Sequence, residues 1–297
     1  MNTSGKLYEC HGHIMLDGIN YTEAVARHKN GIDESAVRKN LQTLADAGVV
    51  YFRDGGDAHL VSAFAKKIAG EYGIHFATPA FGIHKKGRYG NIVGRAYNSL
   101  PEFKELVAIA GENGADYIKL VISGIMTFEK YGELSCPPLS PEEIAELVSV
   151  CHDAGYRVMA HINGAETIKA ALEAGVDSIE HGYFIDDDCI DMLVKTKAIW
   201  VPTVAPLAAA SGFAGKKGEI AAETLEKQLL AVGKAMSKGV YVASGSDSGS
   251  GGVPHGEGIL RELELLKKAG ECLDEKSLME QIGMANERVR KGFVRND

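Results

Sequence analysis

A junction between a helical pattern and a short apolar run recurs along the chain, and this repetition limits the possible folds more than any other feature of the sequence. At each junction a glycine ends the helical pattern and an apolar run follows at once. Glycine suits the left-handed backbone conformation that commonly follows the last turn of a helix. The junction glycines are Gly48, Gly73, Gly114, Gly155, Gly175 and Gly239. The sequence therefore predicts helices that alternate with strands.

Eight apolar runs are predicted to be strands, because two further runs, one before the first helix and one after residue 197, extend the series. The runs cover residues 7–14, 49–52, 74–77, 115–121, 156–160, 176–179, 198–201 and 240–243. Strands that alternate with helices form parallel sheets. Eight such units in about 250 residues favour an α/β fold closed into a (β/α)8 TIM barrel over an open, doubly wound sheet.

The predicted domain organisation is simple. Low-complexity segments and linkers do not stand out, so we expect one domain over residues 1–297, with a terminal helix over 275–293. Stretches without a regular pattern follow predicted strands at residues 82–99, 123–139, 205–218 and 246–256. In a barrel, such stretches form the C-terminal face, where enzymes of this architecture hold their catalytic residues.

Charge and composition argue against several classes of partner. Thirty-two basic and forty acidic residues give a net charge of −8, so no basic excess exists to neutralise nucleic-acid phosphates. No apolar run approaches the roughly 20 residues of a membrane span, and the polar N-terminus lacks a signal-peptide core. Five cysteines without a CxxC pair indicate reduced thiols. We expect a cytoplasmic protein whose partner is a small molecule rather than nucleic acid or a membrane.

Polar residues lie near the far ends of several predicted strands. His11 and His13 are two residues apart, so both imidazoles face the same side of the first strand. The other strand-end residues are Lys119, His161, His181 and Asp247. Taken singly, a strand histidine or lysine is more often structural than functional. Together these residues bring nitrogen and oxygen donors to one end of a barrel, which predicts a site for zinc or a similar divalent metal.

This donor set resembles that of the amidohydrolase superfamily, which has HxH on strand 1, Lys on strand 4, His on strands 5 and 6, and Asp on strand 8. The likeness is greatest to its metal-dependent hydrolase branch, which contains relatives of Xaa-Pro dipeptidase and imidazolonepropionase-like proteins. The similar segments are Glu9–His13, Ile118–Leu120, Ala160–Ala174, Asp177–Gly182, Gly245–Asp247, Pro254–Gly256 and Arg261–Leu263. The likeness extends from about residue 7 to about residue 270.

The resemblance implies a binuclear metal site and a hydrolytic mechanism. Lys119 would react with carbon dioxide to give a carbamate that bridges two divalent ions, with zinc as the expected metal. The first metal would be held by His11, His13 and Asp247, and the second by His161 and His181. A hydroxide shared by the metals would attack a carbonyl carbon, and Asp247 would pass its proton to the leaving amine.

The implied reaction is cleavage of a C–N amide or peptide bond in a small substrate, such as a dipeptide or an N-acyl amino acid. A lactonase, an esterase or a cyclic amidase would use the same nucleophile, and a barrel that binds without catalysis is a further alternative. A deaminase fits less well. Mononuclear deaminases of the superfamily carry a glutamate three residues past the strand-5 histidine, and here that position is Gly164.

Four residues near the predicted strand ends are candidates for substrate binding. Arg53, at the end of the second strand, is expected to face the rim, where it would hold a substrate carboxylate or pair with a neighbouring aspartate. Tyr183 and Thr203 follow the sixth and seventh strands and are expected to line the pocket. His255 follows a glycine-rich segment that leads into a helix. Backbone N–H groups at such a helix start attract anions, although the glycines also suit a simple turn.

Two departures from the family pattern stand out. Members usually carry a small β-sandwich built from segments that flank the barrel, whereas here the first strand begins within ten residues of Met1. We therefore expect a barrel without that sandwich, whose exposed end is polar, covered by the terminal helix or used in a homo-oligomer. Glu9 replaces the usual aspartate and is one methylene longer, which we expect to alter a contact behind the metal ligands.

Overall fold

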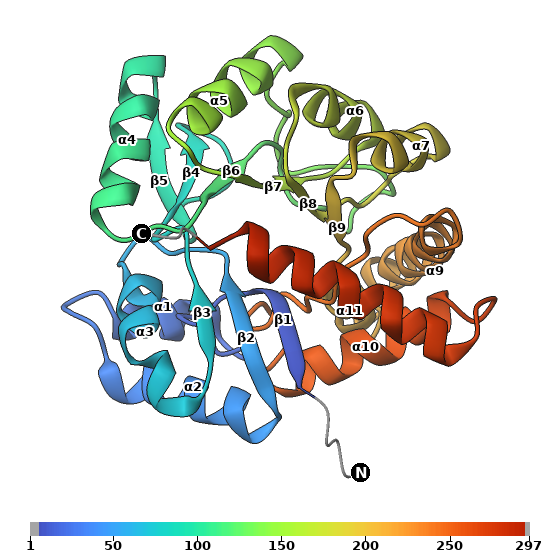
Figure 1. The fold of residues 1–297 in the computed structure, drawn as a ribbon, viewed down its shortest axis with the longest axis horizontal. Helices are drawn as coiled ribbons and strands as arrows, with labels where there is room; N and C mark the ends of the chain where they lie inside the picture. Colours follow the sequence, from blue (N-terminus) through green and yellow to red (C-terminus); the bar gives the residue numbers. More distant parts are fainter. Residues whose placement is uncertain (1–5, 295–297) are drawn as a thin grey trace.

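The computed structural model describes residues 6–294 and shows an α/β fold whose paired strands run parallel (Figure 1). One sheet has the order β1–β2–β3, formed by Leu7–Gly12, Val49–Asp54 and His75–Ala77. The other has the order β5–β4–β6–β7–β8–β9, formed by Gly94–Tyr97, Gly82–Lys85, Ile118–Val121, Val158–Ile162, Ser178–His181 and Ile199–Val201. The predicted α/β class with parallel strands is confirmed.

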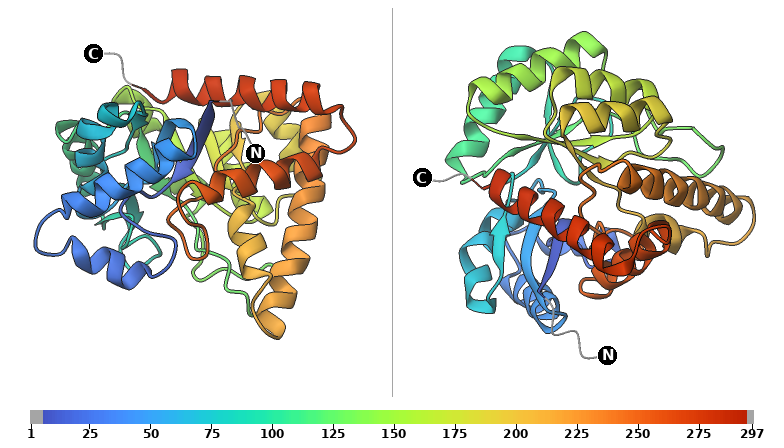
Figure 2. Two further views of the ribbon diagram at one scale, coloured as in Figure 1. Left: turned by 90° about the horizontal axis from the view of Figure 1, so that it is seen from below. Right: turned by 45° about the vertical axis from the view of Figure 1, so that its right-hand side comes forward.

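The α-helices surround the strands (Figures 1 and 2). In chain order from α1 to α11 they are Tyr21–Arg27, Glu34–Asp46, Val61–Ile68, Leu100–Glu112, Pro141–Asp153, Ala165–Ala174, Asp187–Thr196, Ala205–Ala210, Lys216–Ser237, Glu257–Ala269 and Glu275–Gly292. A 3-10 helix follows α3 at Ala69–Tyr72. Several helices begin where a polar side chain accepts a hydrogen bond from the backbone N–H three residues ahead, which caps the first turn. These capping residues are Asp33, Ser99, Ser140, Asp186 and Asp274.

The segment predicted as the eighth strand, residues 240–243, lies between β9 and β1 but does not form a regular strand. Trp200 and Val242 form an isolated parallel bridge, and on the other side the Cys10 N–H donates to the Ser244 carbonyl. Two backbone N–H groups that would bond to a neighbouring strand in a longer sheet donate to side chains instead. The N–H of Ser244 donates to the side chain of Asn286, and that of Ser246 donates to Glu9. The strand prediction is wrong here because these acceptors interrupt the ladder.

The stretch at 82–99, predicted to be irregular, contains the short strands β4 and β5. Gly94 allows these strands to pair, because a Cβ at that position would lie 1.8 Å from the carbonyl oxygen of Gly82. The stretch at 205–218 is likewise partly helical, since it contains α8 and the start of α9. Both corrections concern segments that follow strands and lead toward the candidate site.

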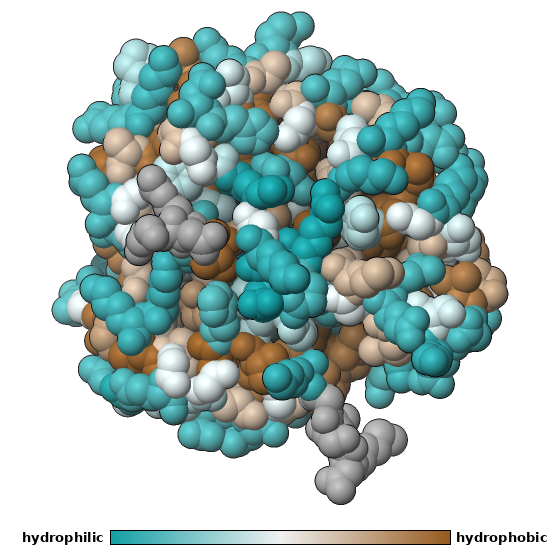
Figure 3. All heavy atoms as spheres, in the orientation of Figure 1, coloured by the Kyte–Doolittle hydropathy of each residue, from teal (hydrophilic) through white to brown (hydrophobic). Residues whose placement is uncertain are grey.

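Helix α11 covers one end of an apolar cluster to which both sheets contribute. Cys10 of β1, Tyr51 of β2, Met159 of β7 and Val201 of β9 pack in this cluster together with Phe293, which follows α11. In Figure 1, α11 lies across the strands, and the same region is largely hydrophilic on the outside in Figure 3. The helix therefore buries one face against the strands and presents a polar face outward. Among the described residues, no helix combines the length and apolar character needed to cross a membrane.

We predict that Gly245→Ala destabilises the fold. An added Cβ would lie 2.5 Å from Cγ1 of Val201 and 2.8 Å from the backbone nitrogen of His11, so the segment would be forced away from β1. Overpacking of this kind costs about 1–3 kcal/mol, measurable by urea unfolding. The control is Gly283→Ala in α11, where an added Cβ meets no atom within 4 Å and helix propensity predicts a gain of up to about 1 kcal/mol. Equal stability of the two variants would contradict the prediction.

Candidate metal centre

The structure brings together all six donor residues that the sequence indicated. They line one cavity of about 480 Å³, and five are buried while Asp247 is partly exposed. His11 lies in β1 and His13 just after it, and Asp247 follows the 240–246 segment. The remaining three are on neighbouring strands of the larger sheet: Lys119 in β6, His161 in β7 and His181 at the end of β8. Parallel strands place their carboxyl ends at one edge, which accounts for this convergence.

The donor atoms lie within a few ångströms of one another. Oδ1 of Asp247 is 3.3 Å from Nε2 of His13 and 3.7 Å from Nε2 of His11. Nζ of Lys119 is 3.5 Å from the same nitrogen of His11. One ligand atom from each of His11, His181 and Asp247 lies within 4.8 Å of the others. The ring of His161 packs edge-on against that of His181, with centroids 4.5 Å apart.

The chemistry of these donors fits divalent cations. Within the described chain, Nε2 of His161 and Oδ1 of Asp247 are buried and make no hydrogen bond, and an unsatisfied buried polar atom costs about 1–3 kcal/mol. Burial lowers the pKa of His161 to about 3. Burial also lowers the pKa values of His11 and His181 well below the usual range. Neutral imidazoles are the form that binds metals, so cations would satisfy donors that the protein leaves open.

Two members of the cluster respond differently to burial. For His13, burial lowers the pKa, but the adjacent Asp247 carboxylate outweighs that effect and raises it overall. For Lys119, burial lowers the pKa to about 8, against the opposing effect of Glu180 and Asp247. Lys119 is thus much more easily deprotonated than an exposed lysine, which makes its nitrogen available as a nucleophile.

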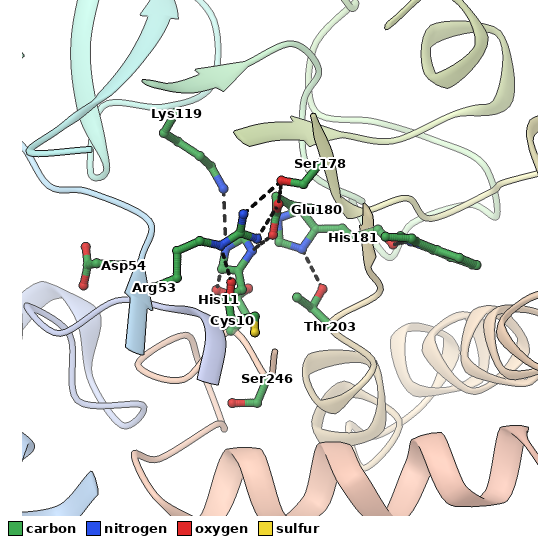
Figure 4. A network of polar contacts seen from close by, with 12 residues as sticks. Cys10, His11, Arg53, Asp54, Lys119, Ser178, Glu180, His181, Thr203 and Ser246 are labelled. Carbon is green, nitrogen blue, oxygen red and sulfur yellow. Dashed lines mark hydrogen bonds and ion pairs between the residues drawn. The ribbon is translucent and has the colours of Figure 1, made fainter. Parts of the chain in front are cut away.

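Arg53 does not face the rim, and the prediction that it could hold a substrate carboxylate from there is wrong. Its side chain is fully buried, and its guanidinium donates to Oε1 of Glu180 at 2.7 Å and to the Cys10 carbonyl (Figure 4). The other oxygen of Glu180, Oε2, lies 2.7 Å from Nδ1 of His11. Arg53 therefore pairs with a carboxylate behind the donor cluster, because a buried guanidinium requires a charged partner.

The backbone is strained where donor side chains leave the strands. His181, Thr203 and Asp247 have left-handed φ values of 67°, 44° and 59°, which cost non-glycine residues about 1–3 kcal/mol each. At His181 the surroundings hold this conformation, because its carbonyl accepts hydrogen bonds from Nε1 of Trp200 and from the side chain of Gln228. Two of the six donors, His181 and Asp247, are thus held in strained conformations.

Of the other three proposed substrate residues, one lies in the cavity lining and two do not. Tyr183 lines the cavity, as expected. Thr203 is not part of the lining; its Oγ1 lies 2.7 Å from Nδ1 of His181 and orients that ring. His255 is also absent from the lining, because its buried ring contacts the Leu16 carbonyl and the Ser248 hydroxyl. The predictions for Thr203 and His255 as pocket residues are therefore wrong, and both have structural partners instead.

Sequence reasoning missed residues around the donors whose roles depend on distant contacts. Tyr89, in the β4–β5 connection, lines the cavity with its ring centroid 5.2 Å from that of His161. Asn163 lines it too, and its side chain links the chain at Gly124 to that at Tyr183. The only available signal for Tyr89 was its location in a stretch that follows a strand.

Glu9 lies behind the donor cluster and contacts the segment that carries Asp247. Its carboxylate accepts hydrogen bonds from the backbone N–H and the hydroxyl of Ser246, the residue that precedes Asp247. Burial raises the pKa of Glu9 to about 7. The longer side chain therefore fixes the segment that carries Asp247.

Comparison with known proteins identifies the family. The family model described as Amidohydrolase family matches residues 9–288. The chain belongs to the amidohydrolase family. Among curated relatives, an uncharacterized protein of Mycobacterium tuberculosis is 29% identical over 170 residues, which cover 55% of this chain and 45% of that protein. The ochratoxinase of Aspergillus niger is 26% identical over 212 residues, which cover 69% of this chain and 42% of the enzyme. The matched regions thus span less than half of each relative.

Solved structures share the fold of this amidohydrolase family member. A Xaa-Pro dipeptidase with bound methionine has a TM-score of 0.74 at 23% identity, covering 98% of this chain and 77% of that chain. The ochratoxinase of Aspergillus niger has a TM-score of 0.74 at 18% identity, covering 93% and 69%. A putative prolidase from Bifidobacterium longum has a TM-score of 0.74 at 21% identity, covering 96% and 69%. At sequence identities between 18% and 23%, these structural similarities establish the fold alone.

We predict that Arg53→Met strongly destabilises this amidohydrolase family member. The substitution leaves the carboxylate of Glu180, which is fully buried, without its charged partner, and breaking a buried ion pair costs about 3–5 kcal/mol. Guanidinium chloride unfolding would measure the loss. The control is Arg38→Met, since Arg38 pairs with Glu34 and Glu71 on the surface, where such pairs contribute little. Similar stabilities for the two variants would show that the Arg53–Glu180 pair does not stabilise the fold.

Proposed function

We propose that this protein hydrolyses a C–N amide or peptide bond in a small molecule, with the dipeptides and N-acyl amino acids of the sequence analysis as the first substrate classes to test. The observation that carries the proposal is the convergence of four imidazoles, a lysine and a carboxylate on one cavity, with buried donor atoms left open. Membership of the amidohydrolase family supports the reaction class. The names of ochratoxinase and Xaa-Pro dipeptidase point in the same direction.

We further propose that the two sheets form one closed (β/α)8 barrel around this site. In support, the Ala243 N–H donates to the Trp200 carbonyl, and the Asp247 N–H donates to the His11 carbonyl, so the 240–247 segment hydrogen-bonds to both sheets. On the opposite side β3 and β4 are consecutive in the chain, and the N–H of Asp116, two residues before β6, donates to the carbonyl of Thr78, which directly follows β3. A closed barrel would make the relative positions of the donors rigid.

The donors divide into two sets that would hold two divalent ions, with zinc as the first candidate. In the proposed arrangement one ion takes His11, His13 and Asp247, and the other takes His161 and His181. Bound at these residues, the cations would supply Lewis acidity, which lowers the pKa of a water molecule toward about 7 and polarises a substrate carbonyl.

Lys119 would enter the site as a carbamate. Its neutral amine attacks carbon dioxide, a nitrogen–carbon bond forms and a proton is released, which leaves a carboxylate with two ligand oxygens. The pKa of about 8 that burial gives Lys119 increases the fraction of neutral amine near neutral pH. The cavity also admits small molecules to this nitrogen, because Lys119 is part of its lining.

Asp247 is assigned the proton transfers. Its side chain lines the cavity, and its Oδ1 has no hydrogen-bond partner among the described residues. A carboxylate at this position accepts a proton from the attacking water and returns it to the leaving nitrogen. Amide hydrolysis needs this second step, because an unprotonated amine is a poor leaving group.

Chelation should abolish hydrolysis of an N-acyl amino acid or dipeptide panel, and zinc with bicarbonate should restore it. Zinc in bicarbonate-depleted buffer should restore much less, because Lys119 then lacks carbon dioxide. Elemental analysis of Lys119→Arg should show less than one metal per chain with an unchanged circular dichroism spectrum. Activity that survives chelation, or a full metal content in Lys119→Arg, would reject the proposed centre.

Asp247→Asn should lower kcat by at least about 10²-fold, the usual contribution of a general acid–base group. The melting temperature should stay close to that of the parent, because Asp247 is partly exposed. The exposed Asp153→Asn on α5 is the matched control and should retain activity. A lactone and ester panel run beside the amides identifies the preferred bond. Turnover of amides by Asp247→Asn at the parent rate would refute the assigned role.

A further inference from the structure

The walls of the cavity above the donor cluster are predominantly apolar. Six apolar side chains from β6 and from three connections line them: Val93, Val121, Ile125, Met126, Phe128 and Phe213. Tyr21, Tyr89 and Tyr183 add aromatic surface. The donor atoms thus form a polar floor beneath a largely apolar chamber. Ligand cavities of this kind select substrates by shape and apolar contact, with a few polar groups fixing orientation.

The mouth of the cavity exposes large apolar side chains. Tyr21 is 58% exposed, Ile125 40% and Phe213 55%. The rings of Phe213 and Phe128 also pack edge-on, with centroids 6.1 Å apart. Clustered apolar groups that stay exposed at the entrance of a cavity mark a binding surface. An apolar part of a ligand that extends out of the chamber would contact this rim.

Several cationic side chains close to the chamber are engaged elsewhere. Lys119 lies in the donor cluster, and Arg53 pairs with Glu180 behind it. In the connections that form the walls, Arg88 donates to the Pro137 carbonyl and Lys217 pairs with Glu129. Among the described residues of the lining, Lys119 is the only lysine or arginine. A substrate carboxylate placed against the walls would therefore lose water without gaining a cationic partner.

One polar group that is buried in the walls without a partner is neutral. The hydroxyl of Ser250 lines the cavity and is buried without a hydrogen-bond partner among the described residues. Asn163 is engaged with the backbone at Gly124 and Tyr183. A hydroxyl suits a neutral carbonyl or amide of the substrate, whereas an isolated carboxylate in an apolar environment carries a much larger desolvation penalty.

From these walls we infer that the substrate is an uncharged amide with apolar, largely aromatic groups beside the scissile bond, in preference to a free dipeptide or N-acyl amino acid. The inference rests on the proposed function and narrows its substrate class. It replaces the recognition that the sequence analysis assigned to Arg53. Aromatic and alkyl groups would pack against Phe128, Phe213 and the tyrosines, and the scissile carbonyl would face the donor cluster.

Three matched amides test this inference on the metal-loaded protein. N-benzoyl-2-phenylethylamine lacks only the carboxylate of N-benzoyl-phenylalanine, and N-benzoyl-phenylalaninamide replaces that carboxylate with a neutral group of similar size. Chromatography measures the release of benzoate. Both neutral compounds should have a kcat/KM at least about tenfold above that of the acid, with the difference mainly in KM. Equal or faster cleavage of the acid would overturn the inference.

Substitutions of Phe213 at the rim distinguish recognition of the substrate's charge from recognition of its shape. Phe213→Arg should raise kcat/KM for the acid about tenfold, because it supplies a partner for the carboxylate, and should lower it for the neutral amides. Phe213→Ala should lower the value for the neutral amides without helping the acid. Met284→Arg on α11, also an exposed side chain but outside the cavity lining, should change neither. Unchanged preference in Phe213→Arg would count against recognition by the apolar rim.

Measurements of binding show whether a negative result contradicts this inference or the proposed function. If none of the three amides is hydrolysed, the proposed function fails for this class, and thermal shift still ranks their binding to the same protein. Larger stabilisation by the two neutral amides than by the acid would uphold the inference about the chamber. Equal or larger stabilisation by the acid would overturn it.

Discussion

The carboxylate of Glu180 is the buried charge on which the donor cluster depends. One oxygen pairs with Arg53 of β2, and the other contacts Nδ1 of His11 in β1, while Glu180 itself belongs to β8. The pair thus connects the two sheets directly beneath the cavity. A carboxylate on one ring nitrogen sets the tautomer and orientation of a metal-binding imidazole. Arg53 in turn offsets the cost of burying that carboxylate, so neither group is tolerated there without the other.

The donor cluster also depends on strained backbone conformations at His181 and Asp247. His181 and Asp247 leave their segments in left-handed conformations, which turn their side chains toward the other donors. Several contacts stabilise these turns. Trp200 and Gln228 hold the carbonyl of His181, and Glu9 holds the residue before Asp247. The surrounding hydrogen bonds offset the local cost, which is how strained residues persist at functional sites.

The cavity combines a polar floor with apolar walls, and the two parts have different origins in the chain. The floor comes from strand ends, where hydrogen bonding between strands fixes positions closely. The walls come from the connections, including Tyr89 between β4 and β5 and Phe213 between α8 and α9. Connections vary without disturbing the strands. The donors therefore come mainly from the strand ends, and most of the cavity walls come from the connections.

Much of this architecture was predictable from local patterns. Glycine junctions predicted the parallel α/β class, and strand-end positions predicted all six donors. The same patterns failed for residues whose role depends on a partner far along the chain. Arg53 looked like a rim residue because its partner Glu180 is 127 positions away. Residues 240–243 looked like a strand because nothing nearby revealed that Asn286 and Glu9 take the neighbouring backbone donors.

The sequence by itself thus determined which donor types occur and that most of them lie at strand ends, since periodicity and spacing are properties of neighbouring residues. Only the tertiary structure decided which charges pair, which side chains reach the cavity and what lines its walls. Those outcomes depend on contacts between segments that are distant in the chain. The outcomes also depend on burial. A buried charge such as that of Arg53 needs a charged partner, and the fold determines which residue lies close enough to be that partner.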